Sequence, residues 1–386
     1  MPQSNESYRN IREKLEGREK EYRLRSLQPI AFRGSKTSAD IGHSTFLNFC
    51  SNDYLGLSGH PEMIRRSNEY TSDHGTSSSA SRLVSGSMKI HHRLEDKIAA
   101  LYNSEASLVF GNGYMANTSI LPALAGRGDL LLADKRCHNS IVQGGILSRA
   151  TFRRFRHNDC NHLEEMLKRH RGNQKNNCWV ITESLFSMDG DFAPLDEISA
   201  LCRQFDACLM VDDAHAFGVW GKQGLGMING KEGVDLGLGT MGKAGGCYGA
   251  FTLSSAVVKE YLINYCAGII YTTAPAPSQV GAMEAAFDLI PNMGNAREQL
   301  RMNIDYLSSG LSDLGYDTGD SRSQIIPILL DDEQEALGLA SRLFNDNIYV
   351  QAIRPPTVDS SRLRITLSAL HTSDDLNRLL EVLKHA

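Results

Sequence analysis

Several features that would place this chain in a specialised class of protein are missing from its sequence. It has no hydrophobic run long enough to span a bilayer, and its first residues, Met-Pro-Gln-Ser-Asn-Glu, lack the apolar core of a signal peptide. It also has no long basic run, and its formal net charge is -5. We therefore expect a cytoplasmic protein that binds neither membranes nor nucleic acid.

The cysteines likewise lack a recognisable pattern. There are eight of them, scattered along the chain, and no two form a C-x-x-C pair. Disulfide frameworks and structural zinc sites need characteristic spacings, so this distribution favours reduced thiols, mostly serving as small core residues. We expect no metal site.

What the chain does contain is a regular alternation of strand and helix patterns. Its 386 residues, 41% of them hydrophobic, can bury a large core and suffice for two domains. Apolar runs predict strands at 107–110, 129–133, 151–155, 179–182, 209–211, 236–238 and 248–253, with helices at 115–124, 161–170, 195–205 and 256–266. This alternation predicts an α/β fold with a large, mostly parallel sheet and helices on both faces.

The two ends of the chain differ from this central part. Residues 1 to about 28 are predicted as a polar helix with a thin apolar stripe of Ile11, Leu15 and Tyr22, ended by Pro29. A helical stretch over 282–314, broken near Pro291, leads into a small α+β unit. The elements of that unit are strands at 324–330, 348–353 and 362–367 and helices at 333–345 and 373–384. We expect three parts: an N-terminal helix and arm (1–45), a large domain (46–285) and a small C-terminal α+β domain (286–386).

Two connecting segments are predicted to be ordered. Residues 47–56 read as a short strand that runs into an Asx-rich turn. Residues 73–87 form a loop of small residues whose composition also suits a disordered linker. The embedded run Arg82-Leu-Val84 favours an ordered wall of a site instead.

Polar groups at the end of one strand mark a candidate site. The run Cys208–Val211 predicts a strand buried on both faces, and Asp212, Asp213 and His215 follow it closely. Ligands of open α/β sheets bind beyond the carboxyl ends of strands, which favours chemistry at Asp212 and His215. The alternative is that the aspartate caps the next turn and the histidine is satisfied locally. These residues alone leave both interpretations open.

Lys243 lies in a second segment, Asp235–Gly246, where glycines surround it after a short apolar run. A surface lysine is the default interpretation of such a Gly-Lys pair. A buried lysine, however, forms Schiff bases with carbonyl compounds, and pyridoxal phosphate needs such an amine together with a carboxylate for its ring nitrogen. Because the two segments supply both groups, we interpret them together as a pyridoxal phosphate site.

Six motifs in the sequence resemble those of the α-oxoamine synthases, pyridoxal phosphate enzymes with the aspartate-aminotransferase-like fold (fold type I). They are Ser51-Asn-Asp-Tyr-Leu-Gly56, Phe110-Gly-Asn-Gly-Tyr114, Ala133-Asp-Lys-Arg-Cys-His138, Glu183-Ser-Leu-Phe-Ser187-Met-Asp-Gly190, Val211-Asp-Asp-Ala-His215 and Gly242-Lys243. The resemblance runs from about residue 20 to the end of the chain. It implies that 46–285 is the cofactor-binding domain.

The resemblance also implies roles at the cofactor ring. Lys243 would hold the cofactor covalently and then remove the α-proton of an amino acid. Asp212 would pair with the pyridinium nitrogen, and His138 would stack on the ring. His215 and Ser187 would lie at the phenolic oxygen. Of these residues, all except Ser187 are implied to be catalytic.

Residues from two subunits are implied at the phosphate. The N–H groups of Gly113 and Tyr114, with the Thr240 hydroxyl, would bind it. A glycine turn that opens a helix offers such donors, although turns of this kind are common in α/β folds. Thr272 and Thr273 would reach the phosphate of a neighbouring subunit, which implies an obligate homodimer.

The substrate residues come from the resemblance alone. Arg354 would clamp the carboxylate of the amino acid with two hydrogen bonds. Arg25, Asn52 and Thr357 would contact the acyl substrate, and His138 is implied on the substrate side as well.

The run 352–358 resembles the branch of the family that serves biotin biosynthesis. This implies a decarboxylative condensation of L-alanine with a pimeloyl thioester of CoA or of an acyl-carrier protein. A glycine-dependent acyltransferase of the same family is the first alternative. The second is a non-catalytic partner subunit on the same fold, which would be expected to lack Lys243.

The chain departs from the family in one loop. The family is usually glycine-rich before Ser81-Arg82, whereas this sequence has Thr76-Ser-Ser-Ser-Ala80. Serine takes positive φ at a higher cost than glycine, so we expect a differently shaped loop near the entrance for the acyl donor.

Overall fold

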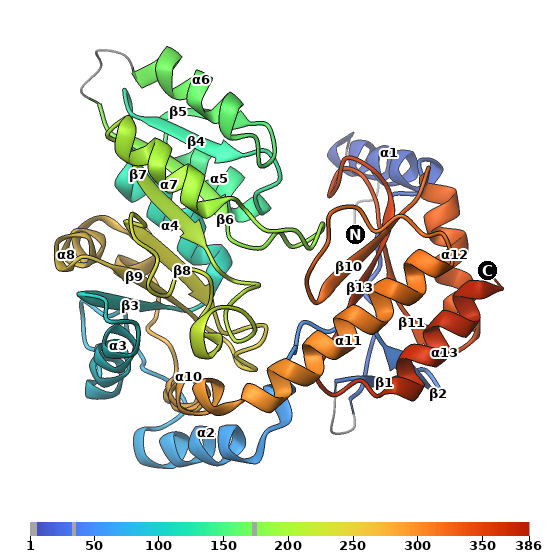
Figure 1. Ribbon diagram of the computed structural model, residues 1–386. Coiled ribbons are helices and arrows are strands. Elements are labelled where there is room, and N and C mark those ends of the chain that lie inside the picture. The colour runs from blue at the N-terminus through green and yellow to red at the C-terminus, as the bar shows by residue number, and fades with distance from the viewer. Residues whose placement is uncertain (1–5, 33–35, 172–175, 386) are drawn as a thin grey trace. The chain divides into compact units, whose positions relative to one another are not determined.

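The computed structural model describes residues 6–32, 36–171 and 176–385. They form two compact units (Figure 1). The first unit comprises Met1–Ser51, Arg301–Leu367 and His371–Ala386, as far as these are described, and the second comprises Asn52–Leu300 with Ser368–Leu370. The N-terminal segment and the C-terminal strands therefore share a unit. The three-part division proposed from the sequence stays a prediction.

The second unit is built on a seven-stranded sheet with the order β3-β9-β8-β7-β6-β4-β5. Strands β4 to β8 run parallel, whereas β9 is antiparallel to both of its neighbours. The bounds are β3 Ala106–Phe110, β4 Leu130–Asp134, β5 Thr151–Phe155, β6 Cys178–Glu183, β7 Cys208–Asp212, β8 Leu236–Thr240 and β9 Ala250–Ser254. The predicted strands are confirmed to within two residues at each end, and so is the α/β fold with a mostly parallel sheet.

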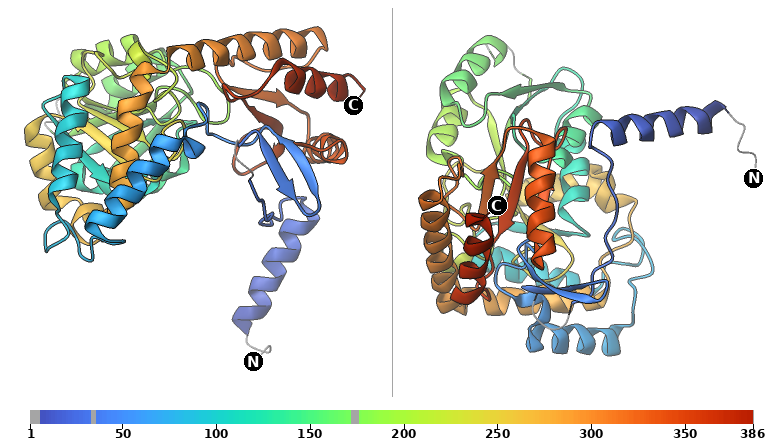
Figure 2. Two further views of the ribbon diagram at one scale, coloured as in Figure 1. Left: turned by 90° about the horizontal axis from the view of Figure 1, so that it is seen from below. Right: turned by 90° about the vertical axis from the view of Figure 1, so that its right-hand side faces the viewer.

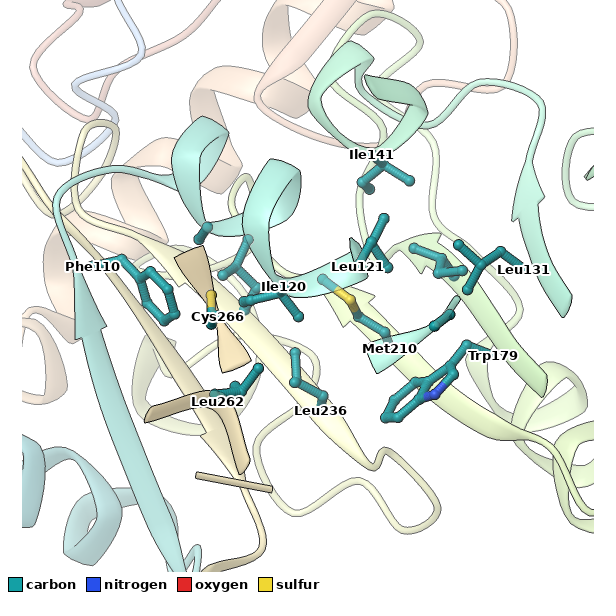
Figure 3. Close-up of a cluster of buried hydrophobic side chains, with 14 of the residues drawn as sticks. Phe110, Ile120, Leu121, Leu131, Ile141, Trp179, Met210, Leu236, Leu262 and Cys266 are labelled. Carbon is teal, nitrogen blue, oxygen red and sulfur yellow. The ribbon is translucent and has the colours of Figure 1, made fainter. Parts of the chain in front are cut away.

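Helices cover both faces of this sheet. Buried apolar side chains of the strands form one cluster with those of α4 (Gly113–Leu124), α5 (Asn139–Leu147), α8 (Ala256–Tyr265) and α9 (Ala267–Ile270) (Figure 3). Helices α6 (Cys160–Arg171) and α7 (Leu195–Gln204) lie on the other face (Figure 1). Burial on both faces explains why the central strands are continuous apolar runs rather than alternating ones.

Three more helices of this unit lie to one side of the sheet. Helix α10 (Pro277–Leu289) packs against α2 (Pro61–His74) and α3 (Lys89–Tyr102). The break predicted near Pro291 is confirmed, because a short 3₁₀ turn (Ile290–Asn292) separates α10 from α11 (Gly294–Asp313). Helices α2, α3 and α5 have no counterpart in the sequence prediction.

The first unit contains two three-stranded sheets. One has the order β1-β2-β11 and the other β10-β13-β12. The strand bounds are β1 Ser38–Ile41, β2 Ser44–Asn48, β10 Ile325–Leu329, β11 Ile348–Tyr349, β12 Gln351–Ile353 and β13 Arg362–Thr366. Helices α12 (Glu333–Asn345) and α13 (Ser373–Lys384) have the bounds that the sequence predicts.

The predicted N-terminal helix is wrong at its end. Helix α1 spans Glu6–Lys20 and has no buried residue; Figure 2 shows it standing off from the strands of its unit. Tyr22 adopts φ 56°, and the Arg23 N–H donates to the Arg18 carbonyl at 2.7 Å. This closure, in which a left-handed residue ends the helix, stops it well before Pro29.

Two predicted strands also need correction. The predicted strand 348–353 is two strands, because β11 pairs with β2 and β12 pairs with β13 in different sheets. The strand predicted to start at Leu47 is β2, which ends at Asn48, and β1 precedes it as an antiparallel partner.

The serine-rich loop is held by specific contacts. Ser79 adopts φ 60°, so a serine occupies the left-handed region here in spite of its cost. The Ser78 hydroxyl donates to the Pro275 carbonyl at 2.7 Å, and Ser81 forms a β-bridge with Thr273. Arg82 forms an ion pair with buried Glu95 at 2.7 Å. The segments before Arg82 and after Thr272 are therefore tied together.

Three further observations concern the described ranges. No helix there is both long and apolar enough to cross a membrane. Within these ranges, no group of three or more His, Cys, Asp or Glu side chains is arranged so that it could hold a metal ion. None of the eight cysteines, all of which are described, forms a disulfide.

Candidate active site

Two neighbouring aspartates have different surroundings: Asp212 is the last residue of β7, and Asp213 follows it. Asp212 accepts hydrogen bonds from the Asn117 side-chain amide (Nδ2–Oδ2, 2.8 Å) and from the Ala214 N–H (N–Oδ1, 3.0 Å). Asp213 accepts from the Ser184 hydroxyl and from the Met227 N–H (3.1 Å). Successive strand residues face opposite sides, which separates the two carboxyl groups.

Asp213 is a structural residue in this arrangement. It is fully buried, and this burial raises the pKa of its carboxyl to about 7. A Cβ atom at Gly226, where φ is +85°, would lie 1.7 Å from Asp213 Oδ2. Gly226 is therefore required for the loop to pass this close to the carboxyl group.

Glu183, which the sequence reasoning missed, lies next to Asp212. It ends β6 and is paired with Asp212 in the register of β6 and β7. Burial, and then the charge of Asp212, raise the pKa of Glu183 to about 8. The charge of Lys243 lowers it, so the lysine lies near this carboxyl group. The signal in the sequence was a glutamate at the end of an apolar run, at the same sheet edge as Asp212.

His138 is the N-cap residue of helix α5 and is held by hydrogen bonds of its backbone and of its ring. Its N–H donates to Glu183, and its Nδ1 accepts from the Ser140 N–H at 3.2 Å. Burial lowers the pKa of His138; the charge of Asp212 opposes this effect, and that of Lys243 adds to it. The residue nevertheless keeps part of its surface accessible to solvent. These contacts bring His138, Asp212, Glu183 and Lys243 together.

Lys243 follows β8 in a turn and is half-buried. The turn needs glycine at Gly246, where φ is +65° and a Cβ atom would lie 2.5 Å from the Ser58 nitrogen. The chain thus holds the lysine beside the carboxyl ends of the strands, although with more exposure than the buried lysine expected from the sequence.

His215 has a partner that the sequence reasoning also missed. Its Nδ1 lies 2.6 Å from the Tyr54 hydroxyl, and both side chains are buried. The Tyr54 hydroxyl also donates to Asn52 at 3.3 Å, which brings one predicted substrate residue to the same group. Ser187 is buried as well.

An anion would fit at the start of α4. Asn112 caps this helix by accepting from the Met115 N–H at 2.8 Å. A Cβ atom at Gly113 would lie 3.5 Å from Thr240 Oγ1, so the helix terminus and the end of β8 adjoin. Helix N-termini bind anions through unpaired N–H groups, and the missing side chain leaves the backbone accessible. Tyr114 next to it is exposed.

Thr272 and Thr273 lie in the segment after α9, where Thr272 is half-buried and Thr273 is exposed. Their predicted contact with a second subunit stays a prediction.

The remaining predicted substrate residues meet in the first unit. Arg25 Nη2 donates to Thr357 Oγ1 at 2.7 Å, and Arg354 donates to the Tyr22 carbonyl. Burial and the charge of Arg25 lower the pKa of Arg354. Two guanidinium groups close together favour an anionic ligand.

The groups in the second unit fit pyridoxal phosphate. An amine, a carboxylate, a tyrosine–histidine pair and a helix N-terminus lie around the carboxyl ends of β6, β7 and β8. These are the functions that the aldehyde, the ring nitrogen, the phenolic oxygen and the phosphate require.

The chain is also similar to known proteins along most of its length. The family model for aminotransferase class I and II matches residues 44–383. The 8-amino-7-oxononanoate synthase of Geobacter sulfurreducens is 44% identical, over 92% of each chain. That of Marinobacter nauticus is 42% identical, over 97% of this chain and 95% of the relative.

Solved structures show the same similarity. The serine palmitoyltransferase of Sphingomonas wittichii matches with a TM-score of 0.89 at 29% identity, covering 100% of this chain and 98% of that one. The 8-amino-7-oxononanoate synthase of Francisella tularensis matches with a TM-score of 0.77 at 28% identity, covering 88% and 97%.

Proposed function

This chain belongs to the aminotransferase class I and II family and, within it, to the α-oxoamine synthases, and on that premise we propose that it is an 8-amino-7-oxononanoate synthase. It condenses L-alanine with a pimeloyl thioester, releases CO₂ and the free thiol of CoA or of the carrier protein, and serves biotin biosynthesis in the cytoplasm. The observation that carries the proposal is the meeting of Asp212, His138 and Lys243 at one sheet edge, in a chain that matches relatives of that name over nearly its whole length.

The proposed cofactor is pyridoxal phosphate, held by residues of the second unit. Bound there, it supplies an electron-withdrawing ring that stabilises negative charge on the α-carbon of the amino acid. Lys243 holds it through its amine, Asp212 pairs with the ring nitrogen, and His138 covers the ring. His215 and Ser187 orient the phenolic oxygen.

The phosphate is bound by the start of α4 and the end of β8. Gly113 and Tyr114 donate backbone N–H groups, and Thr240 donates its hydroxyl. Thr272 and Thr273 complete this site for the second subunit of a homodimer. Dilution to monomers should therefore release the cofactor along with dissociation, and a stable monomer with a full complement of cofactor would contradict the shared site.

The chain's own groups then handle the substrates. Arg354 binds the carboxylate of alanine, and Arg25, Asn52 and Thr357 bind the acyl donor, with His138 adjacent to the substrate. Lys243 Nζ accepts the α-proton of alanine and later returns a proton to the same carbon. The presence of this lysine counts against a non-catalytic partner subunit.

The deciding experiment is product analysis. Alanine, glycine and serine are each offered with a pimeloyl thioester and with shorter and longer thioesters, on CoA and on a carrier protein. We expect 8-amino-7-oxononanoate from alanine and the pimeloyl thioester at the highest kcat/KM. A preference for glycine would support the glycine-dependent branch instead, and a preference for serine with a long acyl chain would support the activity named for the Sphingomonas structure.

A second experiment tests the lysine. Borohydride reduction of the cofactor-loaded protein, followed by peptide mapping, should place the phosphopyridoxyl group on Lys243. Lys259, which forms an ion pair with Glu95 at 3.2 Å, is the control site and should stay unlabelled. Label on any other lysine would contradict the assignment.

A further inference from the structure

Two buried side chains lie between Asp212 and His138. Neither of them has a role in the proposed function. Asn117 is on α4 and Ser140 is in the first turn of α5, and each is 1% exposed. Asn117 Nδ2 lies 2.8 Å from Asp212 Oδ2 and 3.0 Å from Ser140 Oγ. Ser140 Oγ lies 2.8 Å from His138 Nδ1. The four side chains form a continuous chain of hydrogen bonds.

The direction of these hydrogen bonds follows from the donors available. A carboxylate only accepts, so Asn117 must donate to Asp212 through its amide nitrogen. The second N–H of the same amide donates to Ser140 Oγ. The amide oxygen of Asn117 is left buried without a partner. Turning the amide over would place that oxygen against the Asp212 carboxylate, so the observed orientation is the stable one.

The direction then continues to the imidazole. Because Ser140 Oγ accepts from Asn117, its own proton is available to donate to His138 Nδ1. The Ser140 N–H faces the same nitrogen at 3.2 Å. Two donors at Nδ1 exclude a proton there, so the ring proton lies on Nε2.

We call this chain of hydrogen bonds, from Asp212 through Asn117 and Ser140 to His138, the relay. Tight packing between α4 and α5 holds it in place. A Cβ atom at Gly144 of α5 would lie 2.5 Å from the Asn117 carbonyl oxygen. Glycine at this position lets α5 approach α4 closely enough for Ser140 to reach Asn117. The other oxygen of Asp212 is held by the Ala214 N–H at 3.0 Å, so both oxygens of the carboxylate are fixed.

We propose that Asn117 and Ser140 are positioning residues, which join Asp212 to His138 and hold His138 as a neutral imidazole with its proton on Nε2. The inference rests on the proposed function, because that function makes Asp212 and His138 the residues on the cofactor ring. The relay fixes the carboxylate at the ring nitrogen and the imidazole at the ring face relative to each other. It also leaves His138 Nε2–H as a donor to the substrate.

The main test uses the cofactor-free protein. Histidine ¹⁵N chemical shifts report which ring nitrogen carries the proton, and a His138→Gln variant identifies the signals of His138. We expect the Nε2–H tautomer in the wild type. Ser140→Ala removes the hydroxyl donor, and the protonation midpoint of His138 should rise, with a roughly tenfold change in proton affinity.

The matched control is Ser148→Ala. Ser148 lies at the other end of α5, is also buried, and donates to the Gly145 carbonyl at 2.7 Å, outside the relay. It should leave the tautomer and midpoint of His138 as in the wild type. Identical His138 signals in Ser140→Ala and Ser148→Ala would overturn the proposal.

A second arm tests the other half of the relay by cofactor binding. Asn117→Leu removes the donor to Asp212, so the dissociation constant of pyridoxal phosphate should rise roughly tenfold. Wild-type affinity together with a wild-type tautomer in this variant would overturn the relay. A wild-type chain that binds no pyridoxal phosphate would overturn the proposed function instead, and the tautomer of the cofactor-free protein would still decide the relay.

Discussion

The charge on His157 should make the stability of this protein depend on pH in a defined window. His157 follows β5 and lies between two carboxylates, with Nδ1 2.9 Å from Asp134 Oδ1 and Nε2 2.8 Å from Asp191 Oδ2. The ring stands edge-on to Phe186 at 4.4 Å between centroids. Because both carboxylates only accept hydrogen bonds, both ring nitrogens must carry protons, and the imidazole is charged.

The magnitude follows from the pKa of this group. Burial opposes the charge, but the hydrogen bonds to Asp134 and Asp191 outweigh burial and raise the pKa of His157 from 6.5 to about 9. Each tenfold change in proton affinity is worth about 1.4 kcal/mol, so the shift corresponds to about 3 kcal/mol of folding free energy. Because the folded pKa is raised, this contribution is complete below pH 6.5 and is lost as the pH rises to about 9.

Urea unfolding between pH 6 and pH 9.5 tests this. The buried carboxyl groups Asp213 and Glu183 also have raised pKa values, so wild-type stability falls with pH for more than one reason. The comparison with His157→Gln isolates the histidine. The variant should be about 3 kcal/mol less stable than the wild type at pH 6, and the difference should shrink toward pH 9.5.

His91→Gln is the control for the loss of a buried imidazole. Burial lowers the pKa of His91, so this group titrates below pH 6.5, and its loss should leave the pH dependence between 6.5 and 9 unchanged. Parallel stability curves for the wild type and His157→Gln would refute the charged imidazole. The test matters for the site, since Asp134 and Asp191 flank the loops that carry His138 and Ser187.

Three further predictions concern the site and its support. Arg354→Lys should weaken alanine binding about ten- to a hundredfold at an unchanged melting temperature, because a lysine lacks the planar guanidinium group that matches a carboxylate. A lower melting temperature with unchanged alanine affinity would mean that the arginine is only structural. Asp212→Asn should lower kcat by roughly 10²–10⁴-fold, whereas Asp213→Asn should chiefly lower stability, and the reverse pattern would exchange their roles. Gly144→Ala places a Cβ atom 2.5 Å from the Asn117 carbonyl oxygen, so α5 must move away from α4. Thermal unfolding should show a lower melting temperature, and absorbance titration should show weaker cofactor binding. Wild-type values for both would show that α4 and α5 can separate at no cost.

The sequence by itself determined those elements whose signals are local. Helices α12 and α13 have the bounds that the sequence predicts, and the structure shows a capping residue at the start of each. Asp332 accepts from the Gln334 and Glu335 N–H groups, and Thr372 and Asp375 cap each other reciprocally. The strands of the large sheet were predicted because burial on both faces demands uninterrupted apolar runs.

Only the tertiary structure decided where several elements end and which polar groups meet. The end of α1 depends on the left-handed backbone conformation of Tyr22, which a tyrosine in the sequence does not predict. Residues 348–353 are apolar enough for one strand, yet their hydrogen bonds go to two sheets.

The candidate site shows the same division. Asp212, His215 and Lys243 could be proposed from the sequence, because strand-end carboxylates and a glycine-bound lysine carry local signals. Glu183 carries the same strand-end signal, but its altered pKa could not be foreseen, and Asn117 carries no local signal at all. Glu183 has a raised pKa only because β6 pairs with β7, and Asn117 reaches Asp212 only because α4 packs across the sheet. Electrostatic and hydrogen-bond partners act over a few ångströms of space, whatever their separation along the chain.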